Sequence, residues 1–182
     1  MTLPLCISFG SNINPEHNLF HGLARLHALT RLTGISTVYQ TKAIPDPDQP
    51  STSASGGGDP DFLNGVVLLQ EAWDPFELQR CLKQIEIDLG RVPTQPRWAA
   101  RTLDLDIVLM GDCVLHHHGL IVPDPDILTR AFLAVSLAEL VPECVHPVEK
   151  VSLAAIADRF GSHALDWRPD PVSTSRLRKI LA

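Results

Sequence analysis

Two aspartates two positions apart, Asp104 and Asp106, lie within the apolar stretch TLDLDIVLM at residues 102–110. The alternation of apolar and acidic residues predicts a β-strand in which both carboxylates project from the same face. The opposite face would enter the core with Leu103, Leu105, Ile107 and Leu109. At a rise of roughly 3.3 Å per residue the carboxylates stand about 6–7 Å apart, and at that separation they can bridge two phosphate-binding magnesium ions. The alternative is a half-exposed strand that carries two solvated acids.

Arginines precede this strand at Arg91, Arg97 and Arg101, and no acidic residue lies between the first and the last of them. Guanidinium groups beside paired aspartates suit polyphosphate transfer, because they neutralise the charge that moves during the reaction. Trp98 lies among these arginines, and its flat indole ring could stack on a planar heterocycle. The alternatives are a solvated basic loop and a tryptophan packed on its own domain.

Other nucleotide-binding and metal-binding patterns are missing or weak. The sequence contains neither GxxxxGK[ST] nor GxGxxG, which argues against a Walker-type or Rossmann site. Three consecutive histidines, His116 to His118, cannot all face one ion in an extended strand, and no second ligand cluster accompanies them. We therefore expect no metal site at these histidines.

The composition indicates a single globular domain over residues 1–182. Hydrophobic residues make up 45% of the chain, and a net charge of −6 with a pI near 5.7 argues against general binding to nucleic acids or anionic membranes. The four cysteines are widely spaced in or beside apolar runs, which indicates buried, reduced thiols. No stretch resembles a leader peptide or a membrane span, so we expect a cytoplasmic protein, and a monomer.

Hydrophobic periodicity and turn residues predict the order strand, helix, strand, strand, helix, strand, followed by three more helices. The expected strands cover residues 3–9, 35–41, 62–71 and 102–110, and the expected helices run from 15 towards 32 and over 75–89, 127–140, 152–160 and 173–182. Asn14 and Asp74 are candidate N-caps, while Gly34 and Gly90 can end helices. This order indicates an α+β fold, a ferredoxin-like sandwich in which helices pack mainly on one face of an antiparallel sheet. The segments near 43–61 and 91–100 are expected to form mobile loops.

The string RWAARTLDLDIVLMGD at residues 97–112 resembles the signature of the 6-hydroxymethyl-7,8-dihydropterin pyrophosphokinase family, whose pattern is close to RWGPRTLDLDI. Other motifs of that family occur in the right order: FGSN at 9–12, YQT at 39–41, DFLN at 61–64, IEIDLGR at 85–91 and R-x-F at 130–132. The resemblance covers roughly residues 3–142. It implies a ferredoxin-like fold and transfer of pyrophosphate from ATP to the pterin hydroxymethyl group in folate biosynthesis, with release of AMP.

The resemblance also implies roles for individual residues and two small-molecule partners, ATP and the dihydropterin. Two magnesium ions would be bound by Asp104 and Asp106. The triphosphate would be met by Arg91, Arg101 and Arg130, and the adenine site would be lined by Ile107 and Leu120. The pterin would lie between the rings of Trp98 and Phe132, and its edge would be surrounded by Thr41, Ile44, Phe62 and Asn64. The catalytic set would be Arg91, Arg101, Asp104 and Asp106.

Some positions depart from the family pattern. Ala99 and Ala100 replace Gly-Pro, which changes the stiffness of the loop more than its chemistry. Asp124 replaces the histidine of the family's VPHP motif, so a carboxylate would lie where the family has a group that faces phosphate. A carboxylate near the triphosphate is repelled by it, so Asp124 could turn away to solvent, bind magnesium, or pair with Arg130 or a neighbouring arginine. We expect the pairing with an arginine, and a weaker nucleotide affinity as its consequence.

Two further hypotheses come from different functional classes. A paralogue with weakened catalysis could serve as a pterin- or nucleotide-binding protein, or could act on a related pterin. The retained aspartates and arginines favour the enzyme, because a pure binding protein needs no two-metal site. An RNA-binding ferredoxin-like module is disfavoured by the acidic balance and by the missing aromatic RNP1 pattern.

Overall fold

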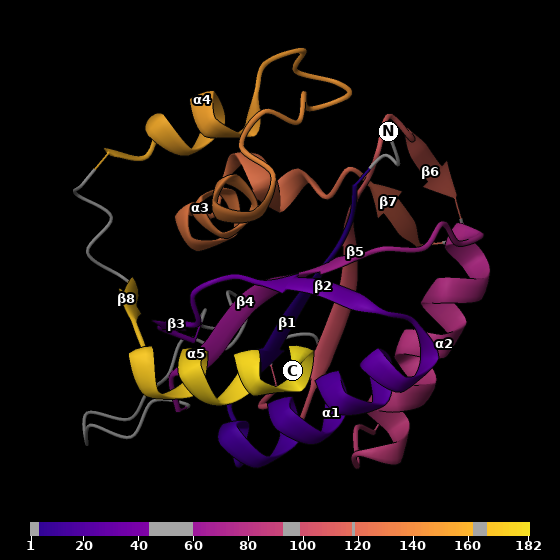
Figure 1. Ribbon diagram of the computed structural model, residues 1–182, viewed down its shortest axis with the longest axis vertical. Coiled ribbons are helices and arrows are strands. Elements are labelled where there is room, and N and C mark those ends of the chain that lie inside the picture. Colours follow the sequence, from indigo (N-terminus) through magenta and orange to yellow (C-terminus); the bar gives the residue numbers. More distant parts are fainter. Residues whose placement is uncertain (1–3, 44–59, 93–98, 118, 162–166) are drawn as a thin grey trace.

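The computed structural model describes residues 4–43, 60–92, 99–117, 119–161 and 167–182 (Figure 1). The strands are β1 (Leu5–Ser11), β2 (Leu32–Ile35), β3 (Tyr39–Thr41), β4 (Phe62–Leu69), β5 (Asp104–Met110), β6 (Leu115–His117), β7 (Leu120–Val122) and β8 (Trp167–Pro169). The α-helices are α1 (Pro15–Leu29), α2 (Pro75–Asp88), α3 (Ala131–Leu140), α4 (Leu153–Asp158) and α5 (Pro171–Arg178). Two short 3-10 helices are η1 (Pro125–Leu128) and η3 (Lys179–Leu181).

One antiparallel sheet forms the centre of the molecule. Its strand order is β5-β1-β4-β3-β8, and β2 also pairs with β4. The two central strands run side by side from the pair Leu5 and Leu69 to the pair Ser11 and Leu63. A separate two-stranded hairpin is formed by β6 and β7. The predicted antiparallel sheet in a mixed helix-and-strand fold is therefore confirmed.

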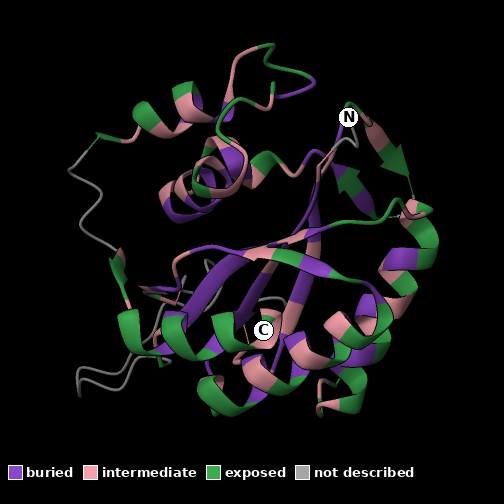
Figure 2. Cartoon of the chain, in the orientation of Figure 1, coloured by how far each residue is buried: buried purple, intermediate pink, exposed green. Residues whose placement is uncertain are grey.

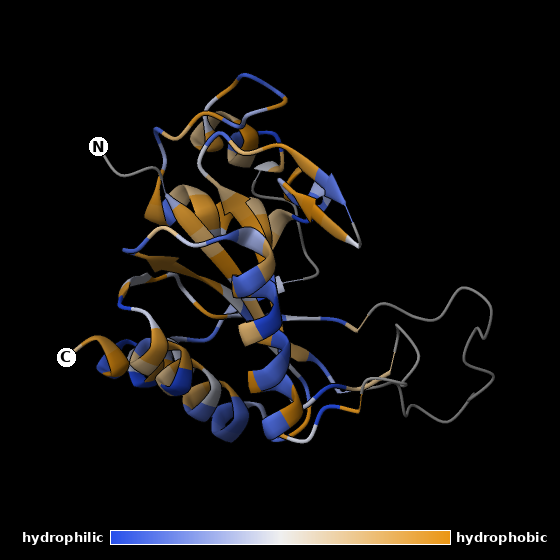
Figure 3. Ribbon diagram, turned by 90° about the vertical axis from the view of Figure 1, so that its right-hand side faces the viewer, coloured by the Kyte–Doolittle hydropathy of each residue, from blue (hydrophilic) through white to orange (hydrophobic). Residues whose placement is uncertain are grey.

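Helices cover both faces of the sheet, which corrects the expectation that they pack mainly on one. The first apolar core lies between the sheet and α1, α2 and α5, with Leu19, Leu23, Leu78, Leu82 and Leu177 among its members. The second lies between the opposite face and α3 and α4, with Cys6, Val66, Leu137, Leu153 and Ile156. Figure 2 shows the buried residues concentrated along the central strands, and Figure 3 shows these strands largely in the apolar colours.

A β-bulge in β5 decides which core each of its side chains enters. The pairing with β1 shifts, so that Ile7 lies opposite Ile107 while Cys6 lies opposite Leu109. The extra residue, Val108, reverses the alternation. Leu105 and Ile107 consequently pack in the first core, whereas Val108 and Leu109 pack in the second. The prediction that Leu109 shares the face of the other apolar residues was wrong, because sequence alternation carries no sign of a bulge.

The helix ends agree with prediction for α2 but less well for α1. The side chain of Asp74 accepts hydrogen bonds from the amides of Phe76 and Glu77, as expected of an N-cap. Gly90 follows α2 with a positive φ of 88°. By contrast, Asn14 is itself left-handed and makes no capping hydrogen bond, and Gly34 lies within β2 because α1 already ends at Leu29.

Differences also occur elsewhere. The predicted strand 35–41 is split into β2 and β3, and the predicted helix 127–140 is split into η1 and α3. The hairpin β6–β7 and the edge strand β8 were not predicted. All four cysteines are free, but only Cys6 is buried. The two expected mobile loops fall mostly on residues outside the described ranges. None of the helices within those ranges has the length and apolar character needed to cross a membrane.

Candidate active site

One cavity of about 550 Å³ lies over the face of the sheet that carries α3. Its floor comes from the three adjacent strands β1, β4 and β5, through Ser8, Gly10, Phe62, Asn64, Asp104 and Asp106. Its walls come from the β6–β7 hairpin and from the segment that leads into α3, through Leu120, Asp124, Asp126, Arg130, Phe132 and Leu133. The cavity therefore unites the predicted carboxylates with several of the residues expected at the pterin.

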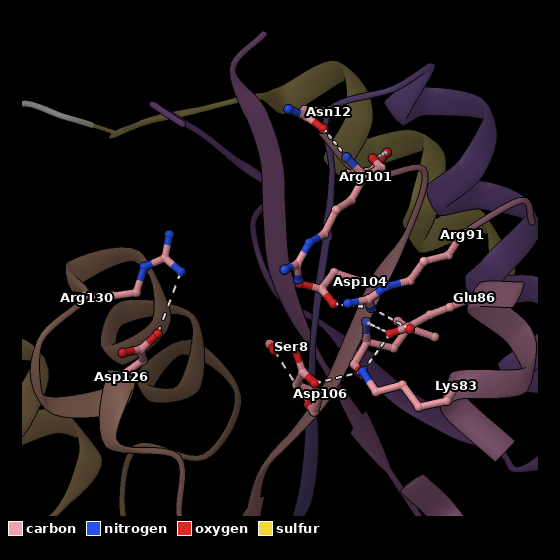
Figure 4. Close-up of polar contacts among 12 residues, drawn as sticks. Ser8, Asn12, Lys83, Glu86, Arg91, Arg101, Asp104, Asp106, Asp126 and Arg130 are labelled. Carbon is pink, nitrogen blue, oxygen red and sulfur yellow. Dashed lines mark hydrogen bonds and ion pairs between the residues drawn. The ribbon is translucent and has the colours of Figure 1, made fainter. Parts of the chain in front are cut away.

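Six charged side chains of alternating sign form a continuous chain along one side of the cavity (Figure 4). In spatial order they are Arg101, Asp104, Arg91, Glu86, Lys83 and Asp106. The chain connects α2, through Lys83, Glu86 and the nearby Arg91, to the strand β5 and to Arg101 before it. Its three positive and three negative charges sum to zero, so these six side chains together carry no net charge.

Asp104 is held by two arginines. Arg91 donates to its Oδ1 at 2.5 Å, and Arg101 donates to its Oδ2. Burial by itself would raise the pKa of Asp104, but the charges of Arg101, Lys83 and Arg91 outweigh it and hold the pKa below its ordinary value. Asp104 is consequently a carboxylate at neutral pH, and both guanidinium groups lie beside it.

Glu86 is the centre of the charged chain, and sequence reasoning missed it. Its side chain is 1% exposed and accepts hydrogen bonds from Arg91, from Lys83 at 2.8 Å and from the amide of Leu105 at 2.7 Å. Burial raises the pKa of Glu86, while these donors oppose the shift. The signal was present: Glu86 follows Leu82 by four positions and thus falls on the apolar stripe of α2, where a charged residue needs a buried partner.

Lys83 contacts three acceptors at once. Its Nζ donates to Glu86 at 2.8 Å, to the carbonyl oxygen of Leu105 at 3.0 Å and to Oδ1 of Asp106 at 2.9 Å. Burial would lower the pKa of Lys83, but Asp106, Glu86 and Asp104 outweigh it and raise the pKa, which keeps the ammonium charged. The sequence had given no role to Lys83.

The turn after β1 holds the backbone of Arg101 through hydrogen bonds. The amides of Asn12 and Ile13 donate to the carbonyl oxygen of Arg101 at 3.1 and 3.2 Å, and Oδ1 of Asn12 accepts from the amide of Arg101 at 2.7 Å. Ser11 donates to the carbonyl oxygen of Thr102 at 2.6 Å. These contacts explain the structural role of the FGSN motif: its last residues position the start of the segment that leads into β5.

The other end of the cavity is less charged. Asn64 is buried and donates to Oγ1 of Thr41 at 2.7 Å. Its Oδ1 lies so close to Gly10 that a Cβ atom on that residue would approach it to 2.5 Å, so glycine is required for this arrangement. Phe62 and Phe132 line the same end, and the guanidinium of Arg130 lies 4.8 Å from the centre of the Phe132 ring.

Among the described residues Asp124 forms no ion pair with an arginine, which corrects our expectation, although the charge of Arg130 acts to lower its pKa. Its Oδ1 accepts a hydrogen bond from the amide of Asp126 at 2.8 Å and caps η1. Arg130 instead forms an ion pair with Asp126 at 3.7 Å. Burial raises the pKa of Asp124 to about 6, and the charges of Asp126 and Asp106 act in the same direction.

The remaining predicted residues divide into three groups. Ile107 and Leu120 are buried and line the cavity beside the carboxylates. Thr41 is buried behind Asn64, which it supports. Ile44 and Trp98 lie outside the residues that the structure describes, as does Arg97.

The sequence is similar to proteins of one family. The model of the family described as 7,8-dihydro-6-hydroxymethylpterin-pyrophosphokinase (HPPK) matches residues 6–142. The 2-amino-4-hydroxy-6-hydroxymethyldihydropteridine pyrophosphokinase of Haemophilus influenzae is 32% identical over 162 residues, which cover 87% of this chain and 94% of that protein. The protein of the same name from Bacillus subtilis is 34% identical over 158 residues, which cover 85% of this chain and 86% of that protein.

Longer proteins contain a similar region. The folic acid synthesis protein fol1 of Schizosaccharomyces pombe is 33% identical over 162 residues, but these are 87% of this chain and only 21% of that protein. The crystal structure of wild-type Plasmodium falciparum HPPK-DHPS superposes with a TM-score of 0.58 at 13% identity, over 88% of this chain and 45% of that one. At such identity the superposition shows a shared fold alone. This chain spans about a fifth of the one protein and less than half of the other.

Proposed function

Because the chain belongs to the 7,8-dihydro-6-hydroxymethylpterin-pyrophosphokinase family, we propose that it transfers pyrophosphate from ATP to 6-hydroxymethyl-7,8-dihydropterin in folate biosynthesis. The hydroxyl oxygen of the pterin attacks the β-phosphorus of ATP. The bond from that phosphorus to the oxygen shared with the α-phosphate breaks, AMP leaves with that oxygen, and the hydroxyl proton passes to solvent. The nucleophile belongs to the substrate, so the protein needs no nucleophilic serine or cysteine.

The observation that carries this proposal is the composition of the cavity. One end presents Asp104 and Asp106 with Arg101, and the other presents Asn64, Phe62 and Phe132. Such a cavity would bring together a polyanion and a flat heterocycle with a hydrogen-bonding edge. Phosphoryl transfer depends mainly on positioning and on stabilising charge, which suits an array of side chains without a nucleophile.

At the nucleotide end, we assign the triphosphate to Arg91, Arg101 and Arg130. Arg91 and Arg101 now bind Asp104, so they would exchange a carboxylate for phosphate oxygens when ATP binds. Arg130 lies across the cavity from them, as Figure 4 shows, and would approach the triphosphate from the opposite side. The apolar side chains of Ile107 and Leu120 would contact the adenine ring.

The donor set fits magnesium. Asp104 and Asp106 point into one cavity, and 48% of the Asp106 side chain is exposed. Among the described residues no cluster of three or more His, Cys, Asp or Glu side chains could hold a metal ion. Magnesium in nucleotide enzymes typically takes one or two carboxylates and completes its shell with phosphates and water. Two bound magnesium ions would neutralise the charge on the transferred group.

At the pterin end, Asn64 is the principal recognition group in this proposal. An amide both donates and accepts hydrogen bonds, as a pterin edge requires. The ring of Phe132 would stack on one face of the heterocycle, and Phe62 would border it. Trp98 and Ile44 keep their proposed roles at the other face and at the edge, although they lie outside the described residues.

Two finer assignments belong to the proposal. The order β1, α1, β2–β3, β4, α2, β5 with the sheet order β5-β1-β4-β3 supports a ferredoxin-like arrangement. Four free cysteines support a reducing compartment, for which we propose the cytoplasm, with the protein as a monomer.

The decisive experiment incubates the protein with ATP, magnesium and 6-hydroxymethyl-7,8-dihydropterin and separates the nucleotides. We expect AMP in equal amount to the pterin pyrophosphate formed, and no ADP. Formation of ADP would contradict pyrophosphate transfer. Binding of ATP and pterin without any turnover would instead favour the alternative, a weakened paralogue that only binds these ligands, and turnover with another pterin would redefine the substrate.

A further inference from the structure

Lys83 makes more hydrogen bonds than a solvated lysine, although 37% of its side chain is exposed. Its ammonium has three hydrogens, and three acceptors surround it: Glu86, the carbonyl oxygen of Leu105 and Oδ1 of Asp106, at 2.8, 3.0 and 2.9 Å. Two of these acceptors are not part of the cavity, since Glu86 is buried and Leu105 contributes its backbone. Lys83 would therefore stay in place even if Asp106 turned to another partner.

The contact with Asp106 is not needed to join α2 to β5. That junction already has the hydrogen bond from the Leu105 amide to Glu86, the hydrogen bond from Lys83 to the Leu105 carbonyl and the ion pair of Arg91, just after α2, with Asp104. Yet Lys83 also binds one oxygen of a half-exposed carboxylate in the cavity. A single fixed positive charge thus restrains the side chain that is assigned to the metal.

The contact between Lys83 and Asp106 affects cation binding, because Lys83 sets the net charge of the charged chain. With Lys83 the six members of the charged chain sum to zero, and without it they would sum to −1. A divalent cation that binds Asp106 must also approach the Lys83 ammonium, which repels it. The triphosphate of ATP carries the negative charge that can offset this repulsion.

We propose that Lys83 is a positioning residue for metal loading, which orients Asp106 through one oxygen and weakens cation binding until the triphosphate is present. This inference rests on the proposed function, because it takes Asp106 as a metal ligand. The positive charge of Lys83 would make the metal enter with the nucleotide, and its three hydrogen bonds would fix the geometry in which Asp106 receives it.

The test measures Mn²⁺ binding to the nucleotide-free protein by electron paramagnetic resonance, with Lys83→Gln and Lys83→Met. Both variants remove the charge, and glutamine keeps part of the hydrogen bonding if methionine prevents folding. We expect Mn²⁺ to bind at least tenfold more tightly to both. Lys83→Arg keeps the charge and should leave the affinity within about twofold of the wild type.

Arg80→Met is the matched control, because Arg80 lies on the same helix and loses an exposed ion pair with Glu77. It should not change Mn²⁺ affinity by more than about twofold. With a non-hydrolysable ATP analogue bound, the neutral Lys83 variants should bind Mn²⁺ less than threefold more tightly than the wild type does.

Unchanged or weaker Mn²⁺ binding in folded Lys83→Gln and Lys83→Met would overturn the proposal and leave Lys83 as a structural residue. Thermal unfolding establishes that each variant is folded. Because Mn²⁺ binding is measured without substrates, this result is independent of the AMP assay, so failure here and failure of the pyrophosphokinase function are distinguishable.

Discussion

Replacing Asp124 by asparagine should stabilise the folded protein at neutral pH. Burial raises the pKa of this cavity-wall carboxyl to about 6, with Asp126 and Asp106 adding to the shift. Within the described residues its side chain makes one hydrogen bond, which it accepts from the Asp126 amide at 2.8 Å. An asparagine oxygen can accept the same hydrogen bond. The substitution therefore removes an unfavourable charge and keeps the contact.

The sign and the size of this gain in stability follow from proton linkage. A carboxyl with a higher pKa in the folded state binds protons more tightly there, so the free energy of unfolding falls as the pH rises. For Asp124 the fall extends from its ordinary pKa of 3.8 to about 6. That interval corresponds to about 3 kcal/mol at about 1.4 kcal/mol per pKa unit. Solvent screening reduces it, so we expect Asp124→Asn to gain about 1–2 kcal/mol at pH 7.5 and almost nothing at pH 4.

Urea unfolding at half-unit steps from pH 4 to pH 8 measures this difference. Carboxyls such as Glu86 titrate in both proteins, so their contributions largely cancel when the two curves are subtracted. Asp112→Asn serves as a control, because it removes one negative charge from an exposed position. A stability difference that does not change between pH 4 and pH 8 would refute the reasoning, even if the variant were more stable.

Three other perturbations test separate parts of the site. Asp104→Asn should leave folding nearly intact and lower turnover at saturating magnesium at least a hundredfold, about 2.7 kcal/mol of transition-state stabilisation, and near-normal turnover would remove the metal assignment. Glu86→Gln should lower the unfolding free energy by about 1–3 kcal/mol in chemical denaturation, because it removes the buried carboxylate shared by Lys83 and Arg91, which keep Asp106 and Asp104 as partners, and a loss below about 0.5 kcal/mol would contradict this. Gly10→Ala should weaken pterin binding at least tenfold in calorimetry without changing ATP affinity, because its Cβ would displace the Asn64 side chain. Equal losses for both ligands would show a general distortion instead.

Local patterns in the sequence were enough to predict the strand that carries Asp104 and Asp106 and the helix α2. The alternation around Asp104 and Asp106 places both in one cavity, and Asp74 caps α2 as its position suggests. Both features depend only on neighbouring residues. The bulge at Val108 could not be predicted in this way, because it arises from the pairing of β5 with a strand about a hundred positions earlier in the chain.

The charged chain shows a second limit of sequence reasoning. Arg91 and Arg101 were found because arginines beside paired aspartates indicate polyphosphate chemistry, whereas no such pattern marks Lys83. The place of Glu86 on the apolar stripe of α2 indicates a buried partner but does not identify it. Only the packing of α2 against β5 buries Glu86 and turns Lys83 towards Asp106. The role of Asp124 was missed for a similar reason. Asp124 caps η1, a short helix that is separate from α3, whereas hydrophobic periodicity predicted one continuous helix over 127–140.

The part of the chain beyond the family match supports the end of the cavity that we propose for the pterin. Residues 6–142 match the family, yet β8 adds an edge strand to β3, with Trp167 opposite Thr41. The rings of Trp167 and Tyr39 lie 4.6 Å apart, and the Val38 amide donates to Oγ1 of Thr174 in α5 at 2.8 Å. Because Thr41 in turn binds Asn64, the position of the proposed recognition amide depends on a strand that is held from both sides. Within the described residues the charged chain is anchored in α2 and β5, so changes in the C-terminal segment should affect the proposed pterin recognition before they affect the charged chain.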